Sequence, residues 1–152
     1  MKGIEKEIYS KFADIATSMG YSEIHGRVLA ALLVEGNPLS LQELAIKTGY
    51  SASTISLSLD LLELLGMIKK IKKVGDRRLY IELKCSLLEG LKRAFLTKIQ
   101  KNISESLFQF GLYKKKLKKS KDKKVLRTLN ILEKEIKKLD KYVSLLAKLK
   151  LR

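Results

Sequence analysis

Two short helical segments meet at a glycine in residues 40–66, SLQELAIKTGYSASTISLSLDLLELLG. Ser40 and Glu43 have the spacing of a capping box, in which the serine oxygen and the glutamate carboxylate satisfy free amides at a helix start. Gly49 ends that short helix, since glycine readily adopts the left-handed conformation that terminates helices. Ser51 caps a second, longer helix. The predicted inner face of this second helix is apolar and consists of Ile55, Leu59 and Leu62.

Two further helices precede this pair. Apolar residues recur every three or four positions over residues 4–19, which predicts an amphipathic helix that stops at Gly20. Ser22 can cap the next helix, which carries an apolar stripe and ends at Gly36. Proline disfavours helix at the residue before it, so residues 37–39, Asn-Pro-Leu, form a short extended link to the capping box.

The periodicity changes after residue 66. Residues 67–74, MIKKIKKV, and residues 79–83, LYIEL, flank the turn Gly75-Asp76. The second run alternates between apolar and polar residues, which predicts a two-stranded ribbon with positions 79, 81 and 83 facing inward. The order helix, link, helix, tight turn, helix and hairpin is that of a winged helix-turn-helix. We therefore predict a mainly α-helical fold with a small β wing.

The last part of the chain predicts two long helices. Apolar positions over residues 86–118 recur at a mean period of about 3.6, and those of the final helix form a strict heptad. One small domain cannot bury both helices, so we expect a dimerisation unit, with an intramolecular hairpin of the two helices as the alternative. The chain then divides into a dimerising helix (1–20), a winged helix-turn-helix (21–85) and a dimerisation region (86–152). The expected dimer contacts are Ile4, Ile8, Phe12, Ile15, Leu129, Leu132, Ile136, Leu139, Val143 and Leu146.

Charge points to an anionic partner. The 152 residues carry a formal charge of +16, and residues 86–152 alone hold 20 basic and 6 acidic groups. Nucleic acid is the leading partner for such a balance, ahead of an acidic membrane surface, although a lysine-rich composition can also reflect habitat. One Cys and one His exclude a cysteine-rich metal site and most acid–base chemistry, so we expect no enzyme, metal or cofactor. Without an apolar run of about 18 residues or a signal-like N-terminus, we expect a cytoplasmic protein.

The predicted site combines a recognition helix with a basic wing. In a helix-turn-helix the second helix inserts its first turns into the major groove, where free amides and the helix dipole also favour phosphate. Arginines at the tip of a narrow ribbon suit the negative potential of a minor groove. A capped, solvated helix and a lysine-rich edge strand are the non-functional alternatives. The expected DNA contacts are Ser40, Gln42, Ser51, Ser53, Thr54, Ser56, Leu57, Lys70, Lys72, Lys73, Asp76, Arg77 and Arg78.

Residues 26–83 resemble the MarR superfamily of winged-helix transcription regulators, especially its GbsR-type branch. The likeness is carried by residues 51–56, SASTIS, by 62–70, LELLGMIKK, and by the wing stretch 75–83, GDRRLYIEL. The resemblance implies a homodimer on a pseudo-palindromic operator and, in many members, a small-molecule effector, whose identity this sequence does not give. It also implies that Ser53, Thr54 and Ser56 meet the major groove, and Asp76 with Arg77 or Arg78 the minor groove. Where many members have Arg after the recognition-helix serine, this chain has Leu57.

The function expected from these features is a dimeric double-stranded DNA-binding regulator of transcription. A non-specific, chromatin-like architectural protein is the first alternative, because the recognition helix offers mainly hydroxyls, which discriminate poorly between bases. A winged helix that binds another protein, with lysines that only keep it soluble, is the second.

Overall fold

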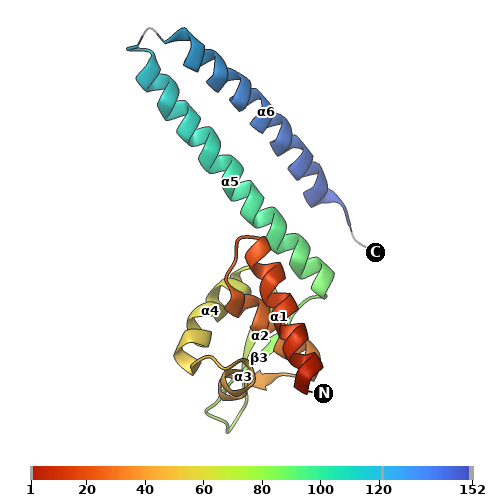
Figure 1. The fold of residues 1–152 in the computed structure, drawn as a ribbon. Coiled ribbons are helices and arrows are strands. Elements are labelled where there is room, and N and C mark those ends of the chain that lie inside the picture. The colour runs from red at the N-terminus through yellow and green to blue at the C-terminus, as the bar shows by residue number, and fades with distance from the viewer. Residues whose placement is uncertain (1, 121, 151–152) are drawn as a thin grey trace. The chain divides into compact units, whose positions relative to one another are not determined.

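The computed structural model describes residues 2–120 and 122–150, which form two compact units, Met1–Ala94 and Phe95–Arg152. The first unit contains α1 (Lys2–Ser18), α2 (Glu23–Glu35), α3 (Leu41–Thr48) and α4 (Ala52–Leu64), with three short strands. Helix α5 (Leu87–Leu117) begins in the first unit and continues into the second, which also holds α6 (Lys123–Lys148) (Figure 1). The predicted helices are all present, within two residues of their expected ends.

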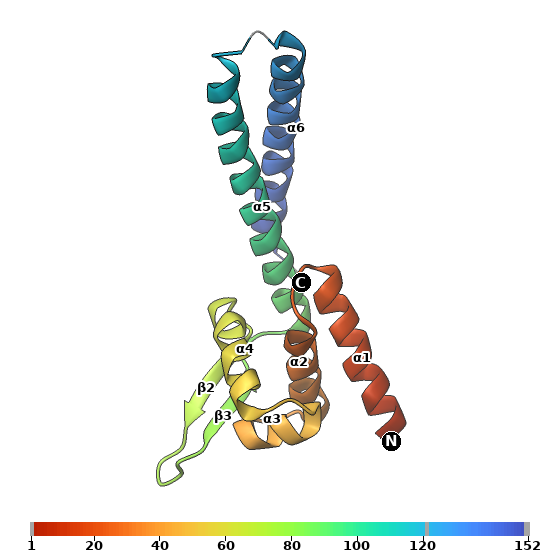
Figure 2. The same cartoon turned by 60° about the vertical axis from the view of Figure 1, so that its left-hand side comes forward.

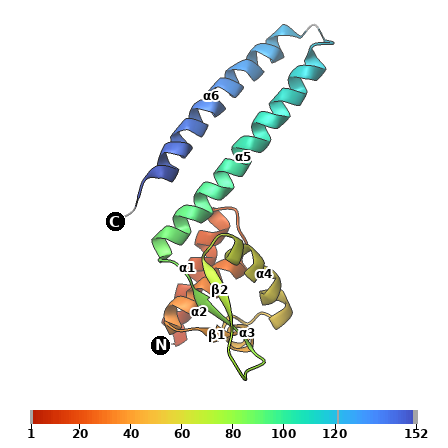
Figure 3. The same cartoon turned by 180° about the vertical axis from the view of Figure 1, so that it is seen from behind.

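The sheet of the first unit has three antiparallel strands in the order β1-β3-β2. Strands β2 (Ile68–Lys72) and β3 (Leu79–Leu83) form the predicted wing hairpin, which extends beyond the helices in Figure 2. The structure confirms this two-stranded ribbon and adds a third strand, β1 (Leu39–Ser40), labelled in Figure 3, which pairs with β3. Two residues are too few to show an alternating pattern, although the proline before them already favours extended backbone.

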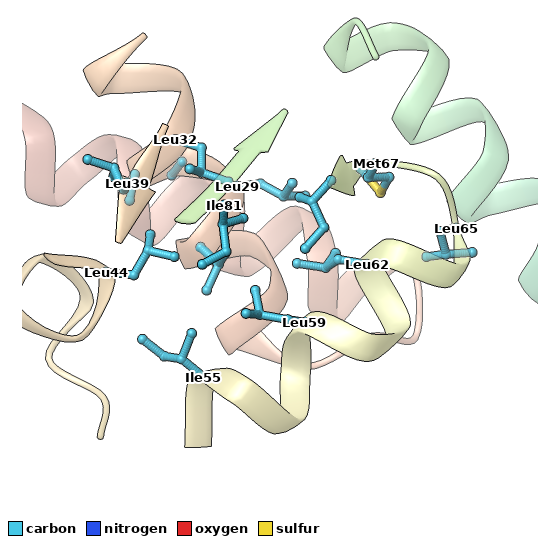
Figure 4. Close-up of a cluster of buried hydrophobic side chains, with 14 of the residues drawn as sticks. Leu29, Leu32, Leu39, Leu44, Ile55, Leu59, Leu62, Leu65, Met67 and Ile81 are labelled. Atoms are coloured by element: carbon cyan, nitrogen blue, oxygen red, sulfur yellow. The ribbon is translucent and has the colours of Figure 1, made fainter. Parts of the chain in front are cut away.

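The core of the first unit lies between α2, α3, α4 and the sheet. As predicted, α4 turns Ile55, Leu59 and Leu62 inward, and all three are buried. They pack with Leu44 of α3 and Ile81 of β3 in the cluster of Figure 4. Because this cluster draws on every element around the wing, it fixes the orientation of α4 relative to the hairpin.

Helix α1 packs on α2 at an unusually close crossing. A Cβ placed on Gly26 would lie 2.2 Å from the carbonyl oxygen of Phe12, so only glycine fits there. Tyr9 and Ala13 are the residues of α1 that this crossing buries, whereas periodicity had singled out a stripe from Ile4 to Ile15. Within that stripe, Ile8 and Phe12 pack against the core of their own unit, and Ile4 and Ile15 remain exposed.

The second unit is a helical hairpin in which α6 turns back along α5 (Figure 1). Leu96 and Ile103 of α5 pack against Val143 of α6, with Ile136 half-buried beside them. An ion pair of 2.5 Å between Lys114 Nζ and Glu133 Oε2 joins the two helices and lowers the pKa of Glu133. The intramolecular hairpin left open by the sequence is therefore present.

This hairpin does not bury the heptad completely. The a positions Leu129 and Val143 are buried. The d positions stay exposed, namely Val125, Leu132, Leu139 and Leu146. Phe108 of α5 is 67% exposed, and Tyr113 is exposed as well. The hairpin thus keeps a large apolar surface in contact with solvent.

Candidate nucleic-acid interface

The first turn of α4 presents a cluster of hydroxyl groups. Ser51 caps the helix as predicted, with its Oγ accepting from the backbone N–H of Thr54 at 3.2 Å. The same Oγ lies 2.6 Å from Thr54 Oγ1 and 3.2 Å from Ser53 Oγ. Ser53, Thr54, Ser56 and Leu57 are all exposed. Hydroxyls at a helix N-terminus, where the positive end of the helix dipole lies, form a surface that favours an anionic ligand such as phosphate.

The start of α3 is occupied by the predicted capping box. Ser40 Oγ accepts from the N–H of Glu43 at 3.1 Å, and Glu43 Oε2 accepts from the N–H of Ser40 at 2.7 Å. This backbone hydrogen bond holds the pKa of Glu43 below its ordinary value. Ser40 is only 1% exposed, whereas the neighbouring Gln42 is exposed. Of these two predicted DNA contacts, only Gln42 has its side chain at the surface.

Asp76 organises the tip of the wing. Its Oδ1 accepts from the Arg78 backbone N–H at 2.9 Å and from Arg78 Nε at 3.2 Å. Its Oδ2 accepts from Arg78 Nη2 at 3.1 Å and from the Tyr80 hydroxyl at 2.8 Å. These charged and neutral donors hold the pKa of Asp76 well below its usual range. The turn itself depends on Gly75, whose φ of +77° suits glycine.

Tyr80 sits beneath the wing cations. The alternating pattern placed positions 79, 81 and 83 inward and left Tyr80 between them, yet Tyr80 is only 8% exposed. Lys73 Nζ lies 3.9 Å from the ring centroid, and the Arg78 guanidinium carbon lies 5.4 Å from it. An aromatic ring attracts such cations electrostatically. The ring therefore holds two of the predicted DNA-binding side chains in place, a role that its aromatic character could have signalled.

The two tip arginines differ in their surroundings. Arg78 is held by Asp76 through its backbone and its guanidinium. The Arg77 side chain is exposed and makes no ion pair within residues 2–120 and 122–150, and its backbone oxygen accepts from Lys72 Nζ at 3.4 Å. Arg77 thus offers a free guanidinium, whereas Arg78 is oriented in advance.

Lys70 connects the wing to α4, a contact that sequence reasoning missed. Its Nζ lies 2.8 Å from Asp60 Oδ1 and 3.7 Å from Glu63 Oε1, both on α4. The hydrogen bond to Asp60 raises the pKa of Lys70. These are the two acidic residues of α4, and they would otherwise repel phosphate. Lys70, predicted as a DNA contact, therefore offsets negative charge on α4 in this structure.

Other site types find little support. Within residues 2–120 and 122–150, no group of three or more His, Cys, Asp or Glu side chains could hold a metal ion. No helix in the same ranges is long and apolar enough to cross a membrane. Cys85 is half-buried against the core as a free thiol. The candidate interface is therefore the surface formed by α4 and the wing.

No protein-family model and no curated protein matches the chain. Among solved structures, a transcriptional regulator of 22% sequence identity matches 95% of this chain and 96% of its own, with a TM-score of 0.70. The chain has the winged helix-turn-helix fold. Weaker matches include the transcriptional regulator BldR of Sulfolobus solfataricus, 20% identical over 89% of this chain and 92% of its own, with a TM-score of 0.45. A point mutant of MepR from S. aureus, solved bound to an oligodeoxyribonucleotide, is 18% identical over 91% and 94%, with a TM-score of 0.46.

Proposed function

We propose that this winged helix-turn-helix protein is a dimeric, sequence-preferring DNA-binding regulator of transcription, without enzymatic activity, that acts in the cytoplasm. The observation that carries the proposal is the joining of α4 and the wing into one surface by Lys70, which offsets the acidic charge of Asp60 and Glu63. An interface freed of local negative charge suits a phosphate backbone. The resemblance of the wing stretch supports membership of the MarR superfamily, with the GbsR-type branch as the finer assignment.

In this proposal α4 enters the major groove. Its N-terminal turns present Ser53, Thr54 and Ser56 to solvent, at the positive end of the helix dipole. Recognition helices contact base edges through their N-terminal residues, and hydroxyls reach both phosphates and bases. Gln42, exposed near the start of α3, would contact the backbone beside the same groove.

The wing would lie against a minor groove. Arg77 supplies the free guanidinium, and Arg78, Lys72 and Lys73 add positive charge around it. Narrow minor grooves concentrate negative potential, which attracts inserted arginine. Asp76 serves to orient Arg78 and does not face phosphate itself, because Arg78 and Tyr80 occupy its carboxylate.

The dimer would use the apolar surface that the hairpin of the second unit keeps exposed. The d positions of α6, such as Leu132 and Leu139, and aromatic residues of α5, such as Phe108, lie in solvent in the single chain. Burial of a leucine contributes about 1.5–3 kcal/mol, so several of them supply a stable contact between subunits. Two subunits would hold two recognition helices at a fixed separation.

A small-molecule effector would have its pocket in the first unit. Apolar side chains of α1, α2, α4 and the first turns of α5, such as Phe12, Leu62 and Leu91, line this pocket together with Met67, which precedes β2. Its lining is apolar, but its volume is only about 40 Å³, so the pocket would have to widen to admit an apolar effector.

Selection of bound sequences from random duplex DNA tests the proposal. We expect inverted half-sites about one helical turn apart, and a selected site that binds far more tightly than bulk DNA at the same salt concentration. Equal affinity for all duplexes would instead favour the architectural alternative, and failure to bind any duplex at low salt would favour a protein-binding role.

A matched pair of variants ties the binding to α4. Ser53→Asp places a negative charge in the first turn of α4, where it favours the helix dipole but repels phosphate. We expect DNA affinity to fall while thermal stability is kept. Ser104→Asp adds the same charge on an exposed position of α5 and should change binding much less.

A further inference from the structure

Leu57 is an exposed apolar residue on the face of α4 that is proposed to meet DNA. Its side chain is 78% exposed, so it contributes little to the core of the first unit. At about 100° per residue, Leu57 shares the outward face of α4 with Ser53 and Ser56. Those two serines are exposed as well, and Leu57 lies at the next helical turn from Ser53.

The rest of this face offers few means of distinguishing bases. Helix α4 contains no Arg, Lys, His, Asn or Gln, the residues that donate strong hydrogen bonds to base edges. Asp60 and Glu63 are engaged by Lys70, and Thr54 shares a hydrogen bond with Ser51. The hydroxyls that remain accept and donate with little discrimination.

We propose that Leu57 is a specificity-determining residue that recognises the 5-methyl group of thymine. The thymine methyl is the apolar group that a base pair displays in the major groove, and an apolar side chain gains free energy by covering it. This inference rests on the proposed function and names the chemistry that the recognition helix reads. It predicts that the operator contains thymine where Leu57 meets each half-site, and that cytosine, which lacks the methyl, is disfavoured there.

A second exposed leucine on the same helix provides an internal control. Leu64 is 83% exposed and also lies on the outward face of α4, but seven residues further along. That separation is about 10 Å at 1.5 Å per residue, which removes Leu64 from the N-terminal turns that contact base edges. The two leucines therefore match in chemistry and exposure and differ in position.

The test removes the methyl group from the DNA and the side chain from the protein. Each thymine of a selected site is replaced singly by deoxyuridine, which lacks only the 5-methyl. The affinity of the full-length protein is then measured for the native chain and for Leu57→Ala, Leu57→Met and Leu64→Ala. At one or more positions in each half-site, deoxyuridine should weaken the native chain and Leu64→Ala about 4-fold, the fold-change that corresponds to one buried methyl-sized group.

At those positions, Leu57→Ala should lose less than about 2-fold, because the partner of the methyl is already gone, and Leu57→Met should behave like the native chain. 5-Methylcytosine should bind more tightly than cytosine at the same positions only when residue 57 is Leu or Met. Equal losses in the native chain and Leu57→Ala, or no loss in either, would overturn the inference while the proposed regulator stands. A selection that returns no preferred sequence would overturn both.

Discussion

The Lys70 ammonium of the wing lies 2.8 Å from the Asp60 carboxylate of the recognition helix and so joins the two parts of the proposed DNA surface. The pair is partly exposed, so its contribution to folding stability is small. Its contribution to binding is electrostatic, because without Lys70 two carboxylates of α4 would face the phosphates.

Substitution of Lys70 tests this role. Lys70→Gln should weaken DNA binding roughly 2- to 5-fold at low salt, the size of an exposed charge interaction, and Lys70→Gln with Asp60→Asn should recover most of the loss. Binding of a fluorescent duplex is measured for the native chain, Lys70→Gln, Asp60→Asn and the double variant, and the four affinities give the coupling between the two residues. If the double variant binds as weakly as Lys70→Gln alone, Lys70 acts by contacting DNA itself.

The wing arginines give a second prediction. Arg77→Ala and Arg78→Ala should each weaken DNA binding without lowering the melting temperature, since both side chains are exposed. The losses should be largest on sites with A·T-rich flanks, where the minor groove is narrow. Asp76→Asn should resemble Arg78→Ala and leave the Arg77 contribution in place, because Asp76 holds Arg78.

A charge-matched control separates the wing tip from overall charge. Lys84→Ala removes one positive charge from an exposed position just after β3, at the base of the hairpin opposite its tip. It should reduce affinity less than either arginine variant. Equal binding of A·T-rich sites by the native chain and both arginine variants would show that the wing does not enter the minor groove.

His25 predicts a pH dependence of stability. The side chain lines the apolar pocket, and Nδ1 accepts from the backbone N–H of Ser22 at 3.2 Å. Burial lowers the pKa of His25 below its ordinary value of 6.5. The unfolded chain therefore binds the proton more readily than the folded chain. The contribution of His25 to the free energy of unfolding should be fully present above pH 6.5 and should be lost as the pH falls through the lowered pKa.

Urea unfolding between pH 5 and pH 8 measures this effect. His25→Gln keeps an acceptor at the third position of the helix but does not titrate, so its stability should vary less over the same range. Because the sequence has one histidine, no other imidazole can supply the difference. If the free energy of unfolding of His25→Gln varies with pH as steeply as that of the native chain, the pH dependence belongs to other groups.

The close crossing at Gly26 gives a second stability prediction. Gly26→Ala should destabilise the first unit by about 1–3 kcal/mol, because the new Cβ would meet the backbone of Phe12 and force α1 away from α2. At Gly3, in α1, an added Cβ would meet nothing within 4 Å, so Gly3→Ala should be neutral or stabilising. Comparable losses in both variants would show that the crossing can relax.

Local patterns in the sequence were sufficient for most of the fold. Capping residues such as Ser40 and Ser51, and the inward spacing of Ile55 and Leu59, depend on neighbours a few residues away, and the structure confirms them. The change from a helical to an alternating period after Gly66 likewise located the wing.

Features that depend on side chains folding over one another, or on distant segments, could not be read from periodicity. The burial of Tyr80 follows from Asp76, Lys73 and Arg78 closing over its ring, and a strict alternation of inward and outward residues does not include such a cover. The Lys70–Asp60 pair needs the wing folded against α4.

The exposed apolar face of α6 gives the last prediction, which concerns assembly. Heptad a positions such as Val143 pack within the hairpin, whereas d positions such as Leu139 and Leu146 are exposed. We therefore expect Leu139→Asp with Leu146→Asp to convert a homodimer into a folded monomer, because burial of unpaired carboxylates at the subunit contact is unfavourable. Asn130→Asp adds negative charge at an exposed polar position of the same helix and should leave the dimer intact.

Light scattering and gel shifts on the same samples connect assembly to recognition. The double leucine variant should keep its helical circular dichroism, have half the native mass and lose most of its affinity for a selected operator, since one half-site alone supplies fewer contacts. Val143→Asp should behave differently, with a loss of helical stability, because its side chain is buried inside the hairpin. A double leucine variant that remains dimeric would place the subunit contact elsewhere. A monomeric variant that binds the full operator as tightly as the native protein would separate DNA recognition from dimer geometry.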